Sequence, residues 1–369
     1  SRRLFTQPVR MRDGHDNFFT PLRLIFALMV MIGHSFVIAG GGSDYEPMLF
    51  LHYSPSYLAV NLFFIASGFL VTGSMLYRGD AASYAGSRLL RIYPGLIVHV
   101  LFVMLVIGLI ATTLTPIRYL LHPDVLSQPL RVLSFVNTDM ILPGVFTENG
   151  EQLASAPLWT LRFEMLCYVG TLLAFSLGLM RRKWMLLAQF VIPSIIWMIG
   201  QGADLFAALP GSVENMVRFG MAYGLGAAIY AYRDRLCSAL WMIPVLATLC
   251  WALRQTDAVD IAMNMMLASG LFYAAFIRIP ALNQLKSLPD MSYGIYIYHW
   301  SILQLAIVFW PSLTGPALLL ISLPVVMGLA WLSWTYVEAP LLRRKDRFGD
   351  WLRFGRQRSP AKHKTVLLD

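Results

Sequence analysis

The chain has 369 residues, of which 57% are apolar and only 13% are charged, whereas soluble domains usually carry about 25% charged residues. With a mean hydropathy of +0.60, this composition excludes an ordinary soluble enzyme. The net charge of +9 would fit a nucleic-acid-binding protein if the basic residues formed one patch on a soluble domain. They are instead spread between apolar runs, so we expect no nucleic-acid partner.

Apolar runs of about 20 residues recur along the whole length, and each can cross a bilayer as a helix. We therefore expect an all-α, polytopic integral membrane protein with about ten transmembrane helices. The predicted spans are 22–38, 57–77, 93–115, 158–179, 184–200, 216–232, 239–253, 259–277, 291–310 and 315–337. They form one transmembrane domain of residues 22–337, which follows a tail of residues 1–21 and precedes a basic tail of residues 338–369.

The distribution of charge predicts the orientation. Ten spans place both termini on one side, and if that side is the cytoplasm, 24 of the 29 Lys and Arg residues lie in inner segments. The positive-inside rule expects such a bias, so both termini are predicted to be cytoplasmic, in a bacterial-type inner membrane. The long, proline-rich connection 116–157 is then an outer, partly re-entrant or amphipathic cap. The tail 338–369 is expected to lie along anionic membrane lipids, with a cytoplasmic partner as the alternative.

Polar groups inside the spans are the candidates for function, because such groups are costly in the bilayer unless they are paired or line a wet cavity. They include Arg23, His34, Asn61, Ser67, His99, Arg162, Glu164 and His299.

Most of these residues fall in six sequence runs. The runs are FFTPLRLIFALMVMIGH (18–34), NLFFIASGFL (61–70), SRLLRIYP (87–94), LWTLRFEMLCY (158–168), SYGIYIYHW (292–300) and TYVEAP (335–340). With these runs in this order, the chain resembles the membrane-bound acyltransferase-3 family, whose members O-acylate sugars and other hydroxylated acceptors. The resemblance covers residues 18–340. It is closest to the stand-alone form, without the extracytoplasmic hydrolase-like domain that many relatives append.

The resemblance implies three functional motifs. They are an Arg and a His separated by ten residues (Arg23 and His34), an Arg-x-x-Arg pair (Arg88 and Arg91) and a Trp-Ser-Leu-x-x-Glu motif (Trp159 to Glu164). In the last motif Thr160 replaces the serine, while Trp159 and Glu164 are retained. Because a hydroxyl is preserved, we do not expect this difference to change the chemistry.

The residues themselves support the same chemistry. Acyl transfer from a thioester to an alcohol needs a base for the hydroxyl proton and donors for the oxyanion, and histidine suits the base role near neutral pH. His34, about 16 Å deeper than Arg23 along a helix, is the best-placed base. Glu164 is expected at a similar depth, where it either orients His34 or holds the acceptor. The alternative for His34 is a hydrogen bond between helices.

His299 closes a tyrosine-rich segment and is a candidate second catalytic or acceptor-binding group, although aromatic residues in spans more often serve packing. His99 is expected to line or pack the interior. For substrate binding we select Trp159, Thr160, Ser67 and Asn61. Packing is the default interpretation of the small residues around Ser67.

Arg88 and Arg91 are three residues apart, so they share one helix face and can act together on a polyanion. The phosphates of acyl-CoA, with acetyl-CoA as the expected donor, fit that description, with Arg23 and Tyr93 as helpers. The alternative is that these arginines set the orientation and touch lipid phosphates. No metal is expected.

The sequence thus predicts an O-acyltransferase that moves an acyl group from cytoplasmic acyl-CoA to a hydroxyl of a cell-envelope glycan or lipid-linked sugar. The expected acyl group is acetyl, which would make the protein an O-acetyltransferase. The alternative is a transporter of a lipid-linked sugar or a small organic solute, because intramembrane His, Glu and Arg also mark transport pathways. Transporters often contain matched repeats and paired broken helices, and neither is visible here. The acceptor, the acyl chain and the oligomeric state remain open.

Overall fold

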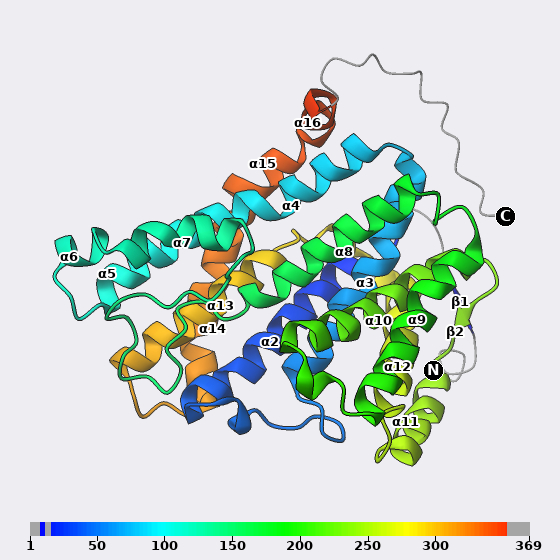
Figure 1. Ribbon diagram of the computed structural model, residues 1–369, viewed down its shortest axis with the longest axis horizontal. Coiled ribbons are helices and arrows are strands. Elements are labelled where there is room, and N and C mark those ends of the chain that lie inside the picture. The colour runs from blue at the N-terminus through cyan, green and yellow to red at the C-terminus, as the bar shows by residue number, and fades with distance from the viewer. Residues whose placement is uncertain (1–7, 12–15, 353–369) are drawn as a thin grey trace.

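The computed structural model describes residues 8–11 and 16–352, and this part of the chain is built almost entirely from helices (Figure 1). The longer helices are α2 (Phe19–Gly40), α3 (Pro55–Arg78), α4 (Ala81–Phe102), α8 (Leu158–Ser176), α9 (Lys183–Gly202), α10 (Gly211–Tyr232), α11 (Met242–Leu253), α12 (Val259–Phe276), α13 (Ser292–Phe309) and α14 (Gly315–Ser333). Shorter helices are α5 (Gly108–Ala111), α6 (Pro116–Leu120), α7 (Pro123–Leu133), α15 (Ala339–Leu342) and α16 (Lys345–Leu352).

Each of the ten expected spans coincides with a helix, but within the described residues only seven helices are long and apolar enough to cross a membrane. The other three are α10, α11 and α13. Helix α11 has only 12 residues, whereas α13 is rich in Tyr, His and Gln side chains that are buried by neighbouring helices. These polar residues lower the mean hydropathy of α13. The helix tolerates them because protein, not lipid, surrounds it. The multi-pass character is therefore clear, while the number of ten spans remains a prediction.

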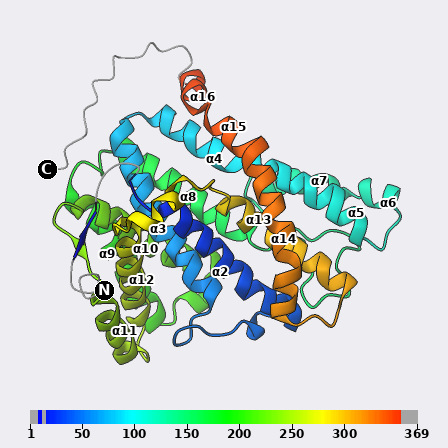
Figure 2. The same cartoon turned by 180° about the vertical axis from the view of Figure 1, so that it is seen from behind.

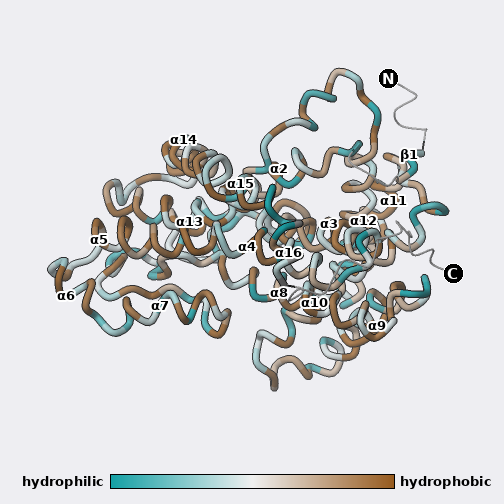
Figure 3. The backbone as a smooth tube through the Cα atoms, turned by 90° about the horizontal axis from the view of Figure 1, so that it is seen from above, coloured by the Kyte–Doolittle hydropathy of each residue, from teal (hydrophilic) through white to brown (hydrophobic). Residues whose placement is uncertain are grey.

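Helix α13 is buried among neighbouring helices along most of its length. It packs against α2 on one side and α14 on another, and α2 in turn packs against α3 (Figures 1 and 2). Helix α10 packs between α3 and α9. Many large apolar side chains on the outer faces are exposed, and apolar residues follow most of the helices in Figure 3. Apolar side chains on the outer faces of the helices are what contact with lipid requires.

Helix α4 begins earlier than expected. The segment 78–92 was expected to be an inner loop, but α4 starts at Ala81, where the side chain of Asp80 accepts a hydrogen bond from the backbone N–H of Ser83 at 2.7 Å. Such a cap satisfies one of the free N–H groups of the first turn. Arg88 and Arg91 therefore lie on the first half of a long helix.

The 116–157 connection folds back onto the helices. Helices α6 and α7 pack together beside α4, and the chain then runs in extended form along α13. Four contacts of 2.6–2.8 Å fix this course: Asn149 with Gln304, Trp300 with the Leu153 carbonyl, Ser301 with the Ala154 carbonyl, and His99 with Ser155. Three of these contacts are made with residues 300–304 of α13, and the fourth, from Ser155, is made with His99 of α4.

Near both chain ends the structure differs from the expected all-α domain with two tails. Strand β1 (Val9–Arg10) pairs antiparallel with β2 (Cys237–Ser238), forming a two-stranded sheet between the N-terminal tail and the connection after α10. At the other end, α16 packs on the first half of α4. A Cβ at Gly86 would lie only 3.1 Å from the ring of Phe348. The basic residues beyond 352, which were expected on the lipid surface, lie outside the described residues.

Candidate active site

A pair of histidines lies at the centre of the helices. Nδ1 of His34 on α2 is 2.8 Å from Nε2 of His299 on α13, with the rings stacked at a centroid distance of 5.1 Å. The edge of Trp300 packs against His34 at 5.0 Å. His299 is fully buried, whereas His34 is half-buried. The two sequence-predicted histidines therefore act as one unit in which His34 is the accessible member.

The hydrogen bonds assign the tautomers of this pair. Nδ1 of His299 lies 3.1 Å from the carbonyl oxygen of Ile295, and a carbonyl can only accept, so this nitrogen carries the proton. In the neutral ring, Nε2 of His299 is then the acceptor and His34 Nδ1–H the donor. The remaining nitrogen of His34, Nε2, holds a free lone pair. His34 is thus arranged as a base, and His299 fixes its tautomer and orientation.

A narrow cavity lies beside Tyr296, which packs near His299, although neither histidine of the pair lines it. It has a volume of about 50 Å³ and is formed by four helices: Arg23 of α2, Val60, Phe63, Phe64 and Ser67 of α3, Thr160, Leu161 and Glu164 of α8, and Ser292, Tyr293 and Tyr296 of α13. Its walls are mainly apolar, with polar groups at both ends. Tyr296 lies one turn before His299, with ring centroids 6.2 Å apart, so the cavity leads from Arg23 towards the histidines.

Glu164 lines this cavity and accepts a short hydrogen bond from the hydroxyl of Tyr168. One of the two roles considered for Glu164 was to orient His34. In the structure His299 is the group at Nδ1 of His34, which leaves Glu164 facing the cavity. Its carboxylate is therefore available to a molecule that enters there.

Thr160 also lines the cavity and is held in place on two sides. Its hydroxyl donates to the Pro157 carbonyl at 3.0 Å, so it accepts from the hydroxyl of Tyr296 at 2.6 Å. A serine would make the same two bonds, which explains why the Thr in the motif preserves the geometry. Ser67 lines the opposite wall.

Trp159 and Asn61 lie further from the cavity than the motif suggested. Trp159 packs its ring against Phe163 and Phe219 at 5.8 and 5.6 Å. The buried Oδ1 of Asn61 accepts from Arg218 at 3.3 Å. Neither is among the residues that line the cavity, so both support its walls.

The arginines at the other end of the cavity converge on Asp290. Arg23 and Arg91 bind the same Oδ2 atom at 2.9 and 2.7 Å, and Ser292 donates to Oδ1 at 2.6 Å. Burial alone would raise the pKa of the Asp290 carboxyl, but the two guanidinium groups and the Ser292 hydroxyl hold it at about 2. Arg91 also lies 4.0 Å from the buried Glu338. Asp290 therefore links the starts of α2 and α13 to the middle of α4.

Arg88 has different surroundings from Arg91. Its guanidinium lies over the rings of Tyr84 and Tyr168, 5.9 and 5.5 Å from their centroids, and among the described residues no carboxylate forms an ion pair with it. Tyr93, the expected helper, donates its hydroxyl to the Leu133 carbonyl at 3.1 Å and so contacts the 116–157 connection. The two arginines of the Arg-x-x-Arg pair thus differ: Arg91 is paired with carboxylates, whereas Arg88 lies over tyrosine rings.

Several functional positions had no clear sequence signal. Asp290 could have been noticed only as an acidic residue just before the tyrosine-rich run, and Glu338 as the acid of TYVEAP. The Ser155 hydroxyl lies 2.8 Å from Nε2 of His99, a contact that links the 116–157 connection to α4.

Among the residues that the structure describes, no cluster of three or more His, Cys, Asp or Glu could hold a metal ion.

Together the buried helices, the histidine pair and the cavity fit a membrane-embedded enzyme. Comparison with known proteins gives the same class: a family model described as "Acyltransferase domain" matches residues 17–335. The chain belongs to this acyltransferase-3 family and is an O-acyltransferase.

Two similar proteins were found. One is the O-acetyl transferase of Shigella phage Sf6, which is 25% identical over 338 residues, 90% of this chain and 97% of that protein. The other is nodulation protein 10 of Rhizobium leguminosarum bv. viciae, which is 28% identical over 358 residues, 90% of this chain and 94% of that one. No solved structure matches the chain significantly.

Proposed function

We propose that this enzyme transfers an acetyl group from cytoplasmic acetyl-CoA to a hydroxyl of a cell-envelope glycan or lipid-linked sugar at the inner membrane. The observation that carries the proposal is the His34–His299 pair, in which His34 is half-buried and keeps one basic nitrogen free. The name of the Sf6 relative supports acetyl as the group transferred.

The donor enters the cavity from the end of Arg23. In this proposal Arg88 binds CoA phosphates, because its guanidinium has no carboxylate partner among the described residues and phosphate is a strong anionic acceptor. The uncharged pantetheine arm follows the apolar walls formed by Phe63, Phe64 and Leu161. Along α2, Arg23 and His34 are about 16 Å apart. An extended pantetheine arm is long enough to cover this distance.

The acceptor hydroxyl arrives from the opposite side and loses its proton to Nε2 of His34. The alkoxide oxygen attacks the thioester carbonyl, and the tetrahedral intermediate collapses with expulsion of the CoA thiolate, which takes up the proton from His34. Glu164 holds the acceptor or polar atoms of the donor in the cavity. Throughout this step the Nδ1–H of His299 donates to the Ile295 carbonyl. Its Nε2 accepts the hydrogen bond from His34 Nδ1–H, both when His34 is neutral and when it is protonated.

A direct test is release of free CoA by the purified protein. We expect acetyl-CoA to be consumed when a hydroxylated saccharide is present, with one ester formed per thiol released. A transporter would bind or move such molecules without breaking the thioester. Thiol release that is absent with every saccharide from the cell envelope would contradict the proposal.

A further inference from the structure

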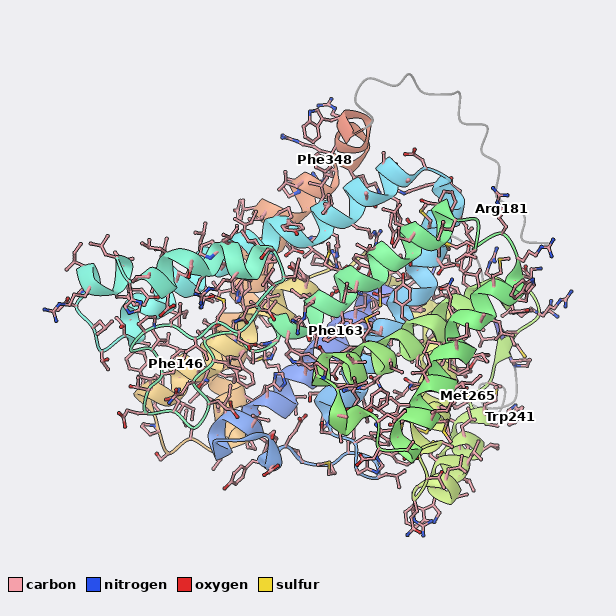
Figure 4. All side chains as sticks on the ribbon, viewed as in Figure 1. Phe146, Phe163, Arg181, Trp241, Met265 and Phe348 are labelled. Atoms are coloured by element: carbon pink, nitrogen blue, oxygen red, sulfur yellow. The ribbon has the colours of Figure 1, made fainter. Side chains whose placement is uncertain are left out.

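A second cavity lies across α8 from the active site. It has a volume of about 350 Å³ and lies between α8 and α10, where its walls include Arg162, Phe163 and Leu166 on one side and Val213, Met216 and Val217 on the other. Phe163, labelled in Figure 4, marks its position on α8. Thr160, Leu161 and Glu164 of the same helix line the active-site cavity. The two cavities are therefore separated by a single helix.

Among the described residues that line this second cavity, Arg162 is the only charged one. Its guanidinium lies over the Phe163 ring, 5.4 Å from the centroid, and its Nε is buried without a hydrogen-bond partner. Among the described residues no carboxylate forms an ion pair with it. Apart from Ser212 the other lining residues are apolar, and an arginine without a carboxylate partner in such surroundings is costly, so this position favours an anionic ligand.

The face of α8 below Arg162 is apolar and open to the surroundings. Leu166, Val169 and Leu173 follow at helical spacing and are 46%, 47% and 56% exposed. From Arg162 to Leu173 the stripe extends about 16 Å. It is one residue wide, so it offers a track for one hydrocarbon chain with the positive charge at its end.

We infer that the α8–α10 cavity binds a single-chain lipid phosphate of the polyprenyl phosphate type, with its phosphate on Arg162 and its chain along Leu166, Val169 and Leu173. A planar guanidinium pairs well with phosphate oxygens, and the stripe fits one chain better than the two of a phospholipid. A sugar carried on that phosphate lies next to the active-site cavity. This last link, that the lipid carries the acceptor, rests on the proposed function.

Binding is tested by native mass spectrometry of the purified protein with a polyprenyl phosphate as the probe. We compare the parent with Arg162→Gln and Arg162→Lys, and we use Arg254→Gln as the matched control, since Arg254 bonds to the Trp251 carbonyl away from this cavity. The Gln variant is expected to lose about tenfold or more in affinity, because a charge-assisted bond is lost. Arg162→Lys keeps the charge but not the planar pair of donors, so its affinity is expected to lie between those of the Gln variant and the parent, whereas the control is expected to match the parent.

Three outcomes would overturn the inference: equal affinity in Arg162→Gln, equal binding of phosphatidylglycerol, or equal binding of the uncharged polyprenol. Leu173→Asn, at the exposed end of the stripe, provides a second variant and is expected to weaken binding of the polyprenyl phosphate but not of inorganic phosphate.

The consequence for catalysis is tested with two acceptors. Arg162→Gln is expected to raise KM for a polyprenyl-phosphate-linked saccharide while leaving KM for the same free saccharide unchanged. An equal rise for both acceptors would contradict the role of the lipid. If the parent acetylates neither acceptor but still binds polyprenyl phosphate through Arg162, the proposed function fails and the binding site stands.

Discussion

Nδ1 of His34 and Nε2 of His299 lie 2.8 Å apart although 265 residues separate them in the chain. Because the Ile295 carbonyl fixes the proton of His299 on Nδ1, this contact determines which nitrogen of His34 is basic. The relationship makes His299 a positioning residue, since it acts on the substrate through His34.

Replacement of His299 tests this positioning role. His299→Phe removes the acceptor for His34 Nδ1–H, and an unsatisfied buried donor costs about 1–3 kcal/mol, so we expect kcat to fall by about tenfold to a hundredfold. His299→Gln, whose amide oxygen can accept the same bond, should recover part of this loss. Equal kcat values for Phe, Gln and the parent would show that His299 serves packing only.

Arg88 and Arg91 should respond differently to substitution. Arg88→Ala is expected to raise KM for acetyl-CoA with little change in thermal stability, because Arg88 has no carboxylate partner among the described residues. Arg91→Ala should lower stability, because it leaves part of the Asp290 and Glu338 charge uncompensated. Dephospho-CoA serves as the control donor: if Arg88 binds the 3′-phosphate, the KM difference between parent and variant should shrink with it. An unchanged KM for acetyl-CoA in Arg88→Ala would remove this assignment.

Asp290→Asn tests the ion pairs that Asp290 forms with Arg23 of α2 and Arg91 of α4. Breaking a buried ion pair on one side costs about 3 kcal/mol or more, so the apparent Tm should fall clearly. The matched control is Asp124→Asn, because the Asp124–Arg131 pair is about half exposed on both sides and such pairs contribute about 1 kcal/mol or less.

The stabilisation that is lost in Asp290→Asn should depend on pH. The pKa of Asp290 is held at about 2, below the ordinary value of about 3.9, so its stabilisation is complete above pH of about 4 and is lost as the pH falls towards 2. The Tm difference between the parent and Asp290→Asn should therefore be constant from about pH 5 to 8 and shrink below about pH 4. A difference that grows on acidification would contradict this pairing.

The orientation can be tested with introduced cysteines. Glu148 and Arg182 are exposed on connections predicted to lie outside and inside, respectively, and Cys237 is the exposed native thiol that must first be replaced by Ser. In intact cells Glu148→Cys should react with an impermeant thiol reagent, while Arg182→Cys should react only after the membrane is opened. The reverse pattern would overturn the cytoplasmic donor site.

The sequence predicted the positions of the helices well because apolar runs and basic flanks follow directly from the membrane environment. It was less informative for α13, since a helix surrounded by protein can carry Tyr, His and Gln at a cost to its hydropathy. The Arg-x-x-Arg pair was expected on one helix face at the cytoplasmic end of the span 93–115, and it lies within α4, which begins well before that span, at the Asp80 cap.

For the site, sequence spacing gave the approximate depth of His34 but not the faces on which helices meet. It therefore could not tell whether Glu164 orients His34 or holds the acceptor, and it did not identify His299 as the partner of His34, because that contact depends on how α2 packs against α13. Asp290 was missed for the same reason, because the convergence of Arg23 and Arg91 on one carboxylate is visible only once three helices are assembled.

The most direct test of the account is the rate of acetyl transfer by His34→Ala, measured with purified protein beside its thermal stability. Loss of a general base costs about 10²–10⁴-fold in rate, so we expect transfer to fall by at least about a hundredfold while Tm stays close to that of the parent. Because residues that act as a unit are non-additive, His34→Ala combined with His299→Phe should be little slower than His34→Ala alone. A His34→Ala enzyme that keeps more than about a tenth of the parental rate would contradict the assignment of His34 as the base.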